Sequence, residues 1–231
     1  MNWFITGDTH RNFDKIEEYI NDFFPVSSNL IILGDAGINY FLDESDNELK
    51  KRLNNLECNF YLVRGNHEER PENLPNMVEV YDDNVKGYIY MEPRYKKIRY
   101  FIDGEEYYIN DQKTLVIGGA YSIDKDYRLS VGWNWFEEEQ LNEEERDQIL
   151  SKVKGKQYDT VLSHTCPESF KYCATKGNLI FGIDNTMELF LENIKENISY
   201  DRWYFGHFHE DLKCEDNAYC LFEYILPFGT I

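Results

Sequence analysis

All five histidines of the sequence follow short apolar runs, within a few residues of Gly, Asp or Asn. They lie in Asp8-Thr9-His10, Gly65-Asn66-His67-Glu68, Ser163-His164 and Gly206-His207-Phe208-His209, and Gly34-Asp35 ends a further apolar run. Imidazole is a common ligand of transition metals such as Zn and Fe, and carboxylates suit Mn. Histidines of a packed core would be expected to scatter through helical patterns as well, and none of these does. Together, the five clusters predict a metal site.

Each cluster on its own also has an ordinary structural explanation. Asp8 and His10 point the same way from an extended chain, yet they could be a turn aspartate and a surface histidine. Asp35 could bridge two cations or cap a turn. Cys166 follows His164 by two residues, but a Cys–His hydrolase would leave the other four histidines unexplained. A metal-based reaction is therefore the better interpretation of the set.

Short apolar runs alternate with helical patterns, which is typical of an α/β layered fold. The predicted strands are Trp3–Thr6, Leu30–Leu33, Phe60–Val63, Leu115–Ile117, Thr160–Ser163 and Trp203–Phe205. The predicted helices are Asn12–Phe23, Asn47–Glu57, Glu137–Val153 and Thr186–Asn197, the last with Asn185 as its N-cap. The region Tyr88–Asn110 predicts aromatic strands with a hairpin turn at Asp103-Gly104, so a mixed sheet is expected. Open α/β sheets place their sites beyond the carboxyl ends of strands, where all five clusters lie.

In this order, Asp8-x-His10, Gly34-Asp35, Gly65-Asn66-His67-Glu68, His164 and Gly206-His207-x-His209 resemble the motif set of the calcineurin-like metallophosphoesterase superfamily. The resemblance spans positions 8 to 209. It implies an α/β fold in which two mixed β-sheets form a sandwich flanked by helices, with a dinuclear site at the strand ends. The length of 231 residues fits one domain, so a single domain over residues 1–231 is expected.

The resemblance also implies a role for each site residue. One metal would be held by Asp8, His10, Asp35 and His209, and the other by Asp35, Asn66, His164 and His207. His67 would be the outer-sphere general acid. A hydroxide bridging two divalent ions would be the nucleophile, because metal binding lowers the pKa of water toward about 7. Mn is the favoured metal, with Fe and Zn as alternatives.

Two departures from the family pattern bear on the substrate. No Asp-Arg-Gly follows Asp35, which argues against the protein phosphatase branch, and Arg11 replaces the Gly common after the metal-binding His10. The stretch from Gly118 to Arg128 resembles small bacterial and phage enzymes of the superfamily. There, Arg128 and Lys125 are expected to contact phosphate together with Asn66, although an ordinary surface loop is the alternative.

Charge and cysteine content limit the partners and the compartment. The net charge of −19 and the absence of a basic patch disfavour long nucleic acids and anionic membranes. The five cysteines are an odd number and form no CxxC pair, which predicts reduced thiols and a cytoplasmic protein. No signal peptide or membrane span is indicated.

The predicted function is hydrolysis of a small phosphomonoester or phosphodiester, such as a nucleotide, by two metals with Asp35 and His67 at the reaction centre. The alternatives are a catalytically silent scaffold that binds a protein partner, and a nuclease. The oligomeric state is left open by the sequence.

Overall fold

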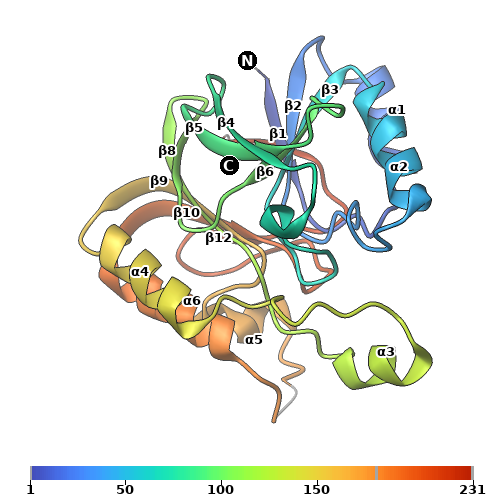
Figure 1. Ribbon diagram of the computed structural model, residues 1–231. Helices are drawn as coiled ribbons and strands as arrows, with labels where there is room; N and C mark the ends of the chain where they lie inside the picture. Colours follow the sequence, from blue (N-terminus) through green and yellow to red (C-terminus); the bar gives the residue numbers. More distant parts are fainter. Residues whose placement is uncertain (1, 180–181, 230–231) are drawn as a thin grey trace.

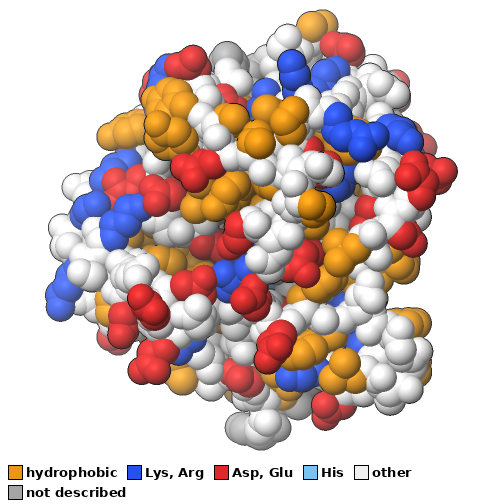
Figure 2. Space-filling model, viewed as in Figure 1, with side chains coloured by type: hydrophobic (Ala, Val, Ile, Leu, Met, Phe, Trp, Pro, Cys, Tyr) orange, Lys and Arg blue, Asp and Glu red, His pale blue; other side chains and the backbone are white. Residues whose placement is uncertain are grey.

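Two β-sheets lie face to face, and helices cover both outer faces (Figure 1). The computed structural model describes residues 2–179 and 182–229. On the face shown in Figure 2, acidic side chains are distributed widely, in keeping with the net charge of −19. The predicted sandwich of two mixed sheets is confirmed.

The first sheet holds seven strands among the described residues. In spatial order they are β13 (Leu226–Pro227), β1 (Trp3–Thr6), β2 (Ser28–Ile32), β3 (Cys58–Leu62), β6 (Ile98–Phe101), β5 (Gly87–Met91) and β4 (Val78–Asp82). The run from β1 to β6 is parallel, and the flanking strands are antiparallel. Its outer face is covered by α1 (Asp14–Asp22) and α2 (Glu44–Asn54), whose apolar side chains join one core cluster with those of β2 and β3.

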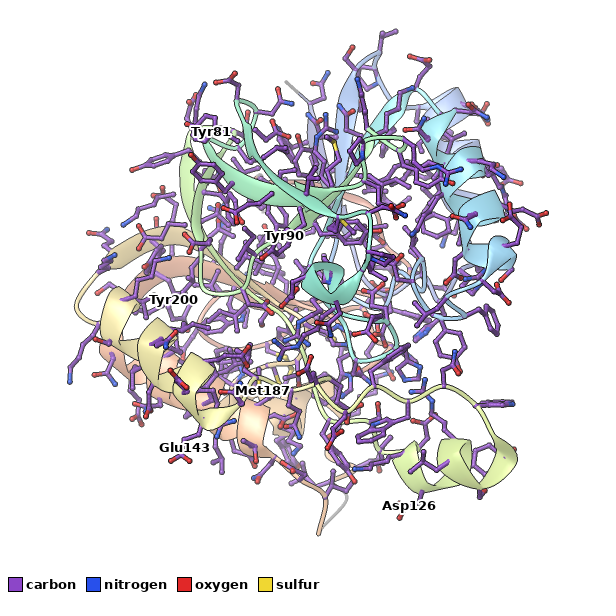
Figure 3. All side chains as sticks on the ribbon, in the orientation of Figure 1. Tyr81, Tyr90, Asp126, Glu143, Met187 and Tyr200 are labelled. Carbon is purple, nitrogen blue, oxygen red and sulfur yellow. A yellow bond between two sulfur atoms is a disulfide. The ribbon has the colours of Figure 1, made fainter. Side chains whose placement is uncertain are left out.

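The second sheet holds six strands of the described chain. Their order is β11 (Leu212–Lys213), β12 (Ala218–Cys220), β10 (Ser199–Phe205), β9 (Gln157–Ser163), β8 (Gln112–Ile117) and β7 (Glu106–Ile109). The four strands from β12 to β8 are parallel. On the outer face lie α4 (Glu143–Val153) and α6 (Thr186–Asn197), and Glu143 points from α4 away from the sheets (Figure 3).

The remaining short helices lie in the connections. They are η1 (Pro71–Asn73), α3 (Lys125–Val131), η2 (Glu168–Phe170) and α5 (Lys171–Ala174). The α3 segment stands off from the sheets at the lower right of Figure 1. None of the helices within residues 2–179 and 182–229 is long and apolar enough to cross a membrane.

Core side chains fill both sides of the central strands. Ile31 and Leu33 contribute to the cluster between the sheets, whereas Leu30 and Ile32 face the helices. Every residue of β2 is buried, as the uninterrupted apolar run predicted for a strand covered on both faces. This two-sided packing holds the strand tips, and hence the polar clusters that follow them, in fixed positions.

The predicted strands and helices are all present. Capping explains the shifted starts of α2 and α4, whereas α1 begins at Asp14 without a side-chain cap. The second helix begins at Glu44, because the Asp43 side chain accepts from the Ser45 backbone N–H at 2.9 Å. The helix predicted from Glu137, α4, begins at Glu143, because Asn142 and Glu145 form a capping box. Asn185 occupies the N-cap position of α6, but its side chain makes no capping hydrogen bond.

The predicted hairpin at Asp103-Gly104 is wrong. This turn joins β6, in the first sheet, to β7, in the second, so the flanking strands do not pair. Gly104 packs against Ile149 of α4, where a Cβ would lie 2.4 Å from Ile149 Cγ1. The turn signal was real, but it marks a crossing between sheets.

The prediction that all cysteines are reduced is also wrong. Cys173 and Cys214 form a disulfide across 41 positions, with Cα atoms 5.8 Å apart. Cys58, Cys166 and Cys220 are free and buried. The two cysteines are 41 positions apart, so no short motif in the sequence indicates their pairing. Since disulfides are rare in a reducing cytosol, the cysteine content no longer supports a cytoplasmic location.

Candidate metal centre

The carboxyl ends of five strands meet at one end of the sandwich. Asp8, Asp35 and Asn66 follow β1, β2 and β3, while His164 and His207 follow β9 and β10. The two aspartates are almost fully buried, with 4% and 1% of their surfaces exposed. The topology therefore brings clusters that are far apart in sequence into one place, as the strand-end argument predicted.

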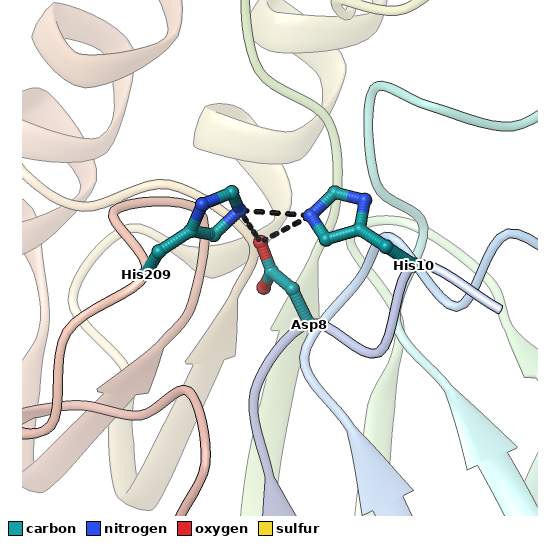
Figure 4. Close-up of side chains that lie close together, drawn as sticks. All are labelled: Asp8, His10 and His209. Atoms are coloured by element: carbon teal, nitrogen blue, oxygen red, sulfur yellow. Dashed lines mark hydrogen bonds and ion pairs between the residues drawn. The ribbon is translucent and has the colours of Figure 1, made fainter. Parts of the chain in front are cut away.

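One cluster consists of Asp8, His10 and His209 (Figure 4). The Oδ2 atom of Asp8 lies 3.3 Å from Nε2 of His209 and 3.8 Å from Nε2 of His10. The two Nε2 atoms are 2.8 Å apart. The hydrogen bond to Asp8 raises the pKa of His209 above its usual value. Both rings are partly exposed, so the cluster is open to solvent on this side.

Asp35 lies between this cluster and the other histidines. Its Oδ1 atom is 3.5 Å from Nε2 of His164, and its Oδ2 atom is 4.0 Å from Nε2 of His10 and 3.9 Å from Nε2 of His67. Burial alone would raise the pKa of Asp35, but the imidazoles of His164, His67 and His10 lower it well below its usual value. Asp35 is therefore a carboxylate with histidine nitrogens, which can bind a metal, on both sides.

The buried His164 provides the clearest test of whether these residues suit a cation. Its Nδ1 lies 2.7 Å from the Leu33 carbonyl, which can only accept, so Nδ1 carries the proton. The lone pair on Nε2 then faces Oδ1 of Asn66 at 2.8 Å. The amide nitrogen of Asn66 donates to Ser122 Oγ at 2.8 Å, which fixes Oδ1 toward the histidine. Two lone pairs beside the Asp35 carboxylate suit a bound cation.

His207 is positioned through its backbone. Its N–H donates to both carboxylate oxygens of Asp8, at 3.0 and 3.1 Å, and its ring centroid lies 5.0 Å from that of His164. Burial and the neighbouring His164 lower the pKa of His207 to about 3, so the ring is neutral at pH 7. The His207 ring belongs to none of the close groups of possible metal-ligand atoms among the described residues. Its assignment as a ligand therefore stays a prediction.

Several of these residues adopt a backbone conformation that L-residues rarely use. The φ angles are 43° at His10, 49° at Asp35, 67° at His207 and 54° at His209. Left-handed conformations of non-glycine residues concentrate at functional sites, where the surrounding structure compensates for the strain. Here the buried strands on either side supply that support.

Two glycines allow the clusters to approach closely. A Cβ on Gly34, whose φ is +97°, would lie 2.1 Å from Nδ1 of His164. A Cβ on Gly65 would lie 2.0 Å from Oδ1 of Asp35. Gly34 therefore leaves space for His164, and Gly65 leaves space for Asp35, because neither glycine carries a Cβ.

His67 lies close to the cluster as well as to solvent. Its backbone N–H donates to Oδ1 of Asp35 at 2.8 Å, and its ring forms a donor group with His10 and Asp35. Burial, opposed by Asp35 and assisted by Arg128, lowers the pKa of His67 from its usual value. The general-acid role stays a prediction, and the geometry also permits His67 to act as a ligand.

The segment from Gly118 to Glu139 packs against Asn66. Ser122 accepts from Asn66 and donates to the buried Glu139, which also accepts from the Trp135 indole N–H at 2.8 Å. The sequence provided no sign of the role of Glu139, because it ends a run of three glutamates that resembles a solvated surface. Ser122 lay within the stretch compared with bacterial enzymes, but nothing distinguished it there.

Arg128 and Lys125 lie on α3, in this same segment. Arg128 is only 1% exposed, and its Nη1 is 3.5 Å from Ser122 Oγ, while Nε and Nη2 have no hydrogen-bond partner. The Lys125 ammonium lies 3.7 Å from the centroid of the Trp135 ring. Arg11, after His10, is tied instead to Asp46 and to the Gly37 carbonyl.

Comparison with known proteins supports the interpretation of these motifs. The sequence profile of the calcineurin-like phosphoesterases matches residues 1–211. The chain belongs to this family. Among solved structures, this calcineurin-like phosphoesterase is similar to the phosphopantetheinyl hydrolase of Mycobacterium tuberculosis, with a TM-score of 0.46 and 11% identity. The match covers 96% of this chain and 88% of that one. A comparison with curated proteins found no match.

The predicted family and fold are therefore confirmed. Membership in the calcineurin-like phosphoesterases implies divalent metal ions, and the Asp and His groups described above are candidate ligands for them. The identity of the metals and the role of each ligand are taken up below as proposals.

Substitution of Gly65 should impair metal binding and also lower the free energy of unfolding. In Gly65→Ala, the new Cβ would lie 2.0 Å from Oδ1 and 2.2 Å from the backbone N of Asp35, so the carboxylate and the backbone that carries it must both shift, and we expect Mn²⁺ affinity to fall at least about tenfold. Isothermal titration calorimetry measures the affinity, and circular dichroism checks the fold. Gly155→Ala is the control for adding a methyl group at a glycine: Gly155 has open space around it, and its positive φ adds a backbone strain that Gly65 lacks. Equal affinities in the two variants would contradict the close-approach argument.

Proposed function

We propose that this protein is a dinuclear metal-dependent phosphoesterase that hydrolyses a small phosphomonoester or phosphodiester. The proposal rests chiefly on Asp35, a buried carboxylate with His10 and His67 on one side and His164 on the other. One carboxylate with donors on two sides suits two cations that share a ligand. Family membership supports phosphate ester chemistry at this place.

The ligand sets are those that the family resemblance implies. Asp8, His10, Asp35 and His209 would hold one ion, and Asp35, Asn66, His164 and His207 the other. The group of Asp8, His10 and His209 supports the first set, and the group of Asp8, Asp35 and His164 supports part of the second. When bound, two such ions neutralise phosphate charge and supply a nucleophile at neutral pH. Mn²⁺ is the favoured metal, since the set combines carboxylate and amide oxygens with imidazole nitrogens.

Arg128 is the best candidate for holding the phosphate. Its Nη1 lies 3.8 Å from Oδ1 of Asp124, but the buried Nε and Nη2 have no hydrogen-bond partner among the described residues, which favours a further anion there. Its position beside Ser122, which accepts a hydrogen bond from Asn66, supports a role close to the proposed metals. The Lys125 ammonium already lies on the Trp135 ring, so Lys125 is the weaker candidate.

His67 would donate a proton from its ring to the departing oxygen of the ester. The ring is 27% exposed and faces the same opening as His10, so a substrate can reach it. Its N–H···Asp35 backbone contact keeps it beside the reaction centre. General acid catalysis of this kind typically contributes about 10²–10⁴-fold.

Small substrates are favoured over proteins and long nucleic acids. The net charge of −19 repels polyanions, and no Asp-Arg-Gly follows Asp35. A small ester needs only the local positive charge of the metals and Arg128.

Asp35→Asn should remove metal and activity together. The wild-type protein saturated with Mn²⁺ should contain about two ions per chain. The variant loses the shared charge, so we expect its metal affinity to fall by more than about a hundredfold and turnover to become undetectable. Asp83→Asn, at a side chain that is 90% exposed, is the control. A wild type that binds two ions yet hydrolyses no ester would favour the scaffold alternative.

Substitution of His67 should discriminate between leaving groups. In His67→Asn, we expect turnover of alkyl esters to fall about 10²-fold or more, and turnover of p-nitrophenyl esters much less, because p-nitrophenolate leaves without a proton. Steady-state kinetics and elemental analysis provide the two readouts. Loss of one metal would instead identify His67 as a ligand. An equal loss for both esters would point to phosphate orientation.

Arg128→Gln should weaken transition-state binding while keeping the metals. Hydrogen bonds to charged groups contribute about 1.5–3 kcal/mol, so we expect kcat/KM to fall roughly 10- to 100-fold. Ser130→Ala is a matched control on α3, because its hydroxyl is exposed and bonds only the Tyr127 carbonyl among the described contacts. Unchanged kcat/KM in Arg128→Gln would show that the segment is an ordinary surface loop.

A further inference from the structure

An apolar hollow lies between α3 and the loop that follows Asp35. It has a volume of about 380 Å³ and is lined by Tyr40, Phe41, Gly132, Trp133 and Asn134. Asn134 Nδ2 donates to the Tyr40 carbonyl at 2.7 Å, which joins the two segments. We refer to this hollow as the aromatic pocket.

The walls of the aromatic pocket are exposed rings. Trp133 is 56% exposed and Phe41 is 47% exposed. One face of Phe41 is already covered by the Arg11 guanidinium, 4.8 Å from the ring centroid. Figure 2 shows hydrophobic surface at the lower right of the molecule, the region where α3 lies in Figure 1. Exposed apolar clusters of this kind mark binding sites more often than chance surface.

The aromatic pocket shares a wall with the proposed phosphate site. The guanidinium of Arg128 lies 5.4 Å from the centroid of the Tyr40 ring, and the Trp133 backbone N–H donates to the Arg128 carbonyl at 2.9 Å. Arg128 in turn reaches Ser122, the hydrogen-bond partner of Asn66. Asp126 points away from the sheets (Figure 3), so the buried Arg128 occupies the inner side of α3. A chain of contacts through Ser122 and Arg128 therefore links the candidate ligand Asn66 to the aromatic pocket.

We propose that the aromatic pocket binds the organic part of the substrate, and that this part is a planar aromatic group such as a nucleobase. The inference rests on the proposed phosphoesterase function. Because the Arg128 guanidinium lies 5.4 Å from the centroid of the Tyr40 ring, an ester whose phosphate lies beside Arg128 can extend toward the pocket. The volume is in the range of small-molecule sites, and stacking on aromatic side chains accepts any flat ring. The walls offer few polar groups, so the pocket would select for a flat ring and would distinguish little between one base and another.

The test compares an aromatic with a non-aromatic ester. Wild-type protein with Mn²⁺ should hydrolyse adenosine monophosphate with a higher kcat/KM than glycerol phosphate. In Trp133→Ala, we expect the ratio of the two kcat/KM values to fall about tenfold, mainly through KM for the nucleotide, because a stacking contact acts on ground state and transition state alike. Trp133→Phe should retain most of the ratio. Leu129→Ala, an exposed α3 position outside the pocket lining, should leave it unchanged.

A separate binding measurement distinguishes failure of this inference from failure of the proposed function. Adenosine, which carries no phosphate, should show saturation transfer from the wild-type protein in NMR and a clearly weaker signal with Trp133→Ala. Hydrolysis of both esters with no change of ratio in Trp133→Ala would overturn the aromatic subsite and leave the phosphoesterase standing. Absence of hydrolysis with adenosine binding retained would reject the reaction alone. A change of oligomeric state in Trp133→Ala, measured by light scattering, would identify the surface as a protein interface and overturn the inference.

Discussion

Two carboxylates, Asp8 and Asp35, are buried close together at the tips of neighbouring parallel strands. Burying a charge is costly unless it is paired, and burying two like charges side by side is more so. The rest of the site can be understood from that constraint. Imidazoles surround both groups, and backbone N–H donors from His67 and His207 hold their oxygens. A cation bound between these groups would offset the cost of burying both charges.

The sequence indicated where in the fold these candidate ligands lie because that information is local. Each ligand candidate directly follows a strand whose apolar pattern is unambiguous, and parallel strands bring such tips together. The fold class follows from the same alternation of strands and helices. Strand positions were predicted more closely than helix starts, since caps at Asp43 and Asn142 depend on single side chains.

What the sequence could not predict depends on contacts between distant residues. Gly104 resembles a hairpin turn, yet it crosses between sheets because α4 packs on it. Glu139 looks solvated, yet it is buried against Ser122. The aromatic pocket joins residues nearly a hundred positions apart, and neither Tyr40 nor Trp133 belongs to a periodic pattern. Such features have no local signature, so they are found only once the chain is folded.

The disulfide between Cys173 and Cys214 encloses α6, β10 and both His207 and His209 in one covalent ring. Closing a loop of 41 residues removes chain entropy from the unfolded state equivalent to about 4 kcal/mol in the simplest treatment. His207 and His209 thus belong to a segment whose conformational entropy in the unfolded state is reduced by the disulfide. The stability of the segment that carries two candidate ligands therefore depends on the redox potential of the surroundings, although neither sulfur lies among the ligand candidates.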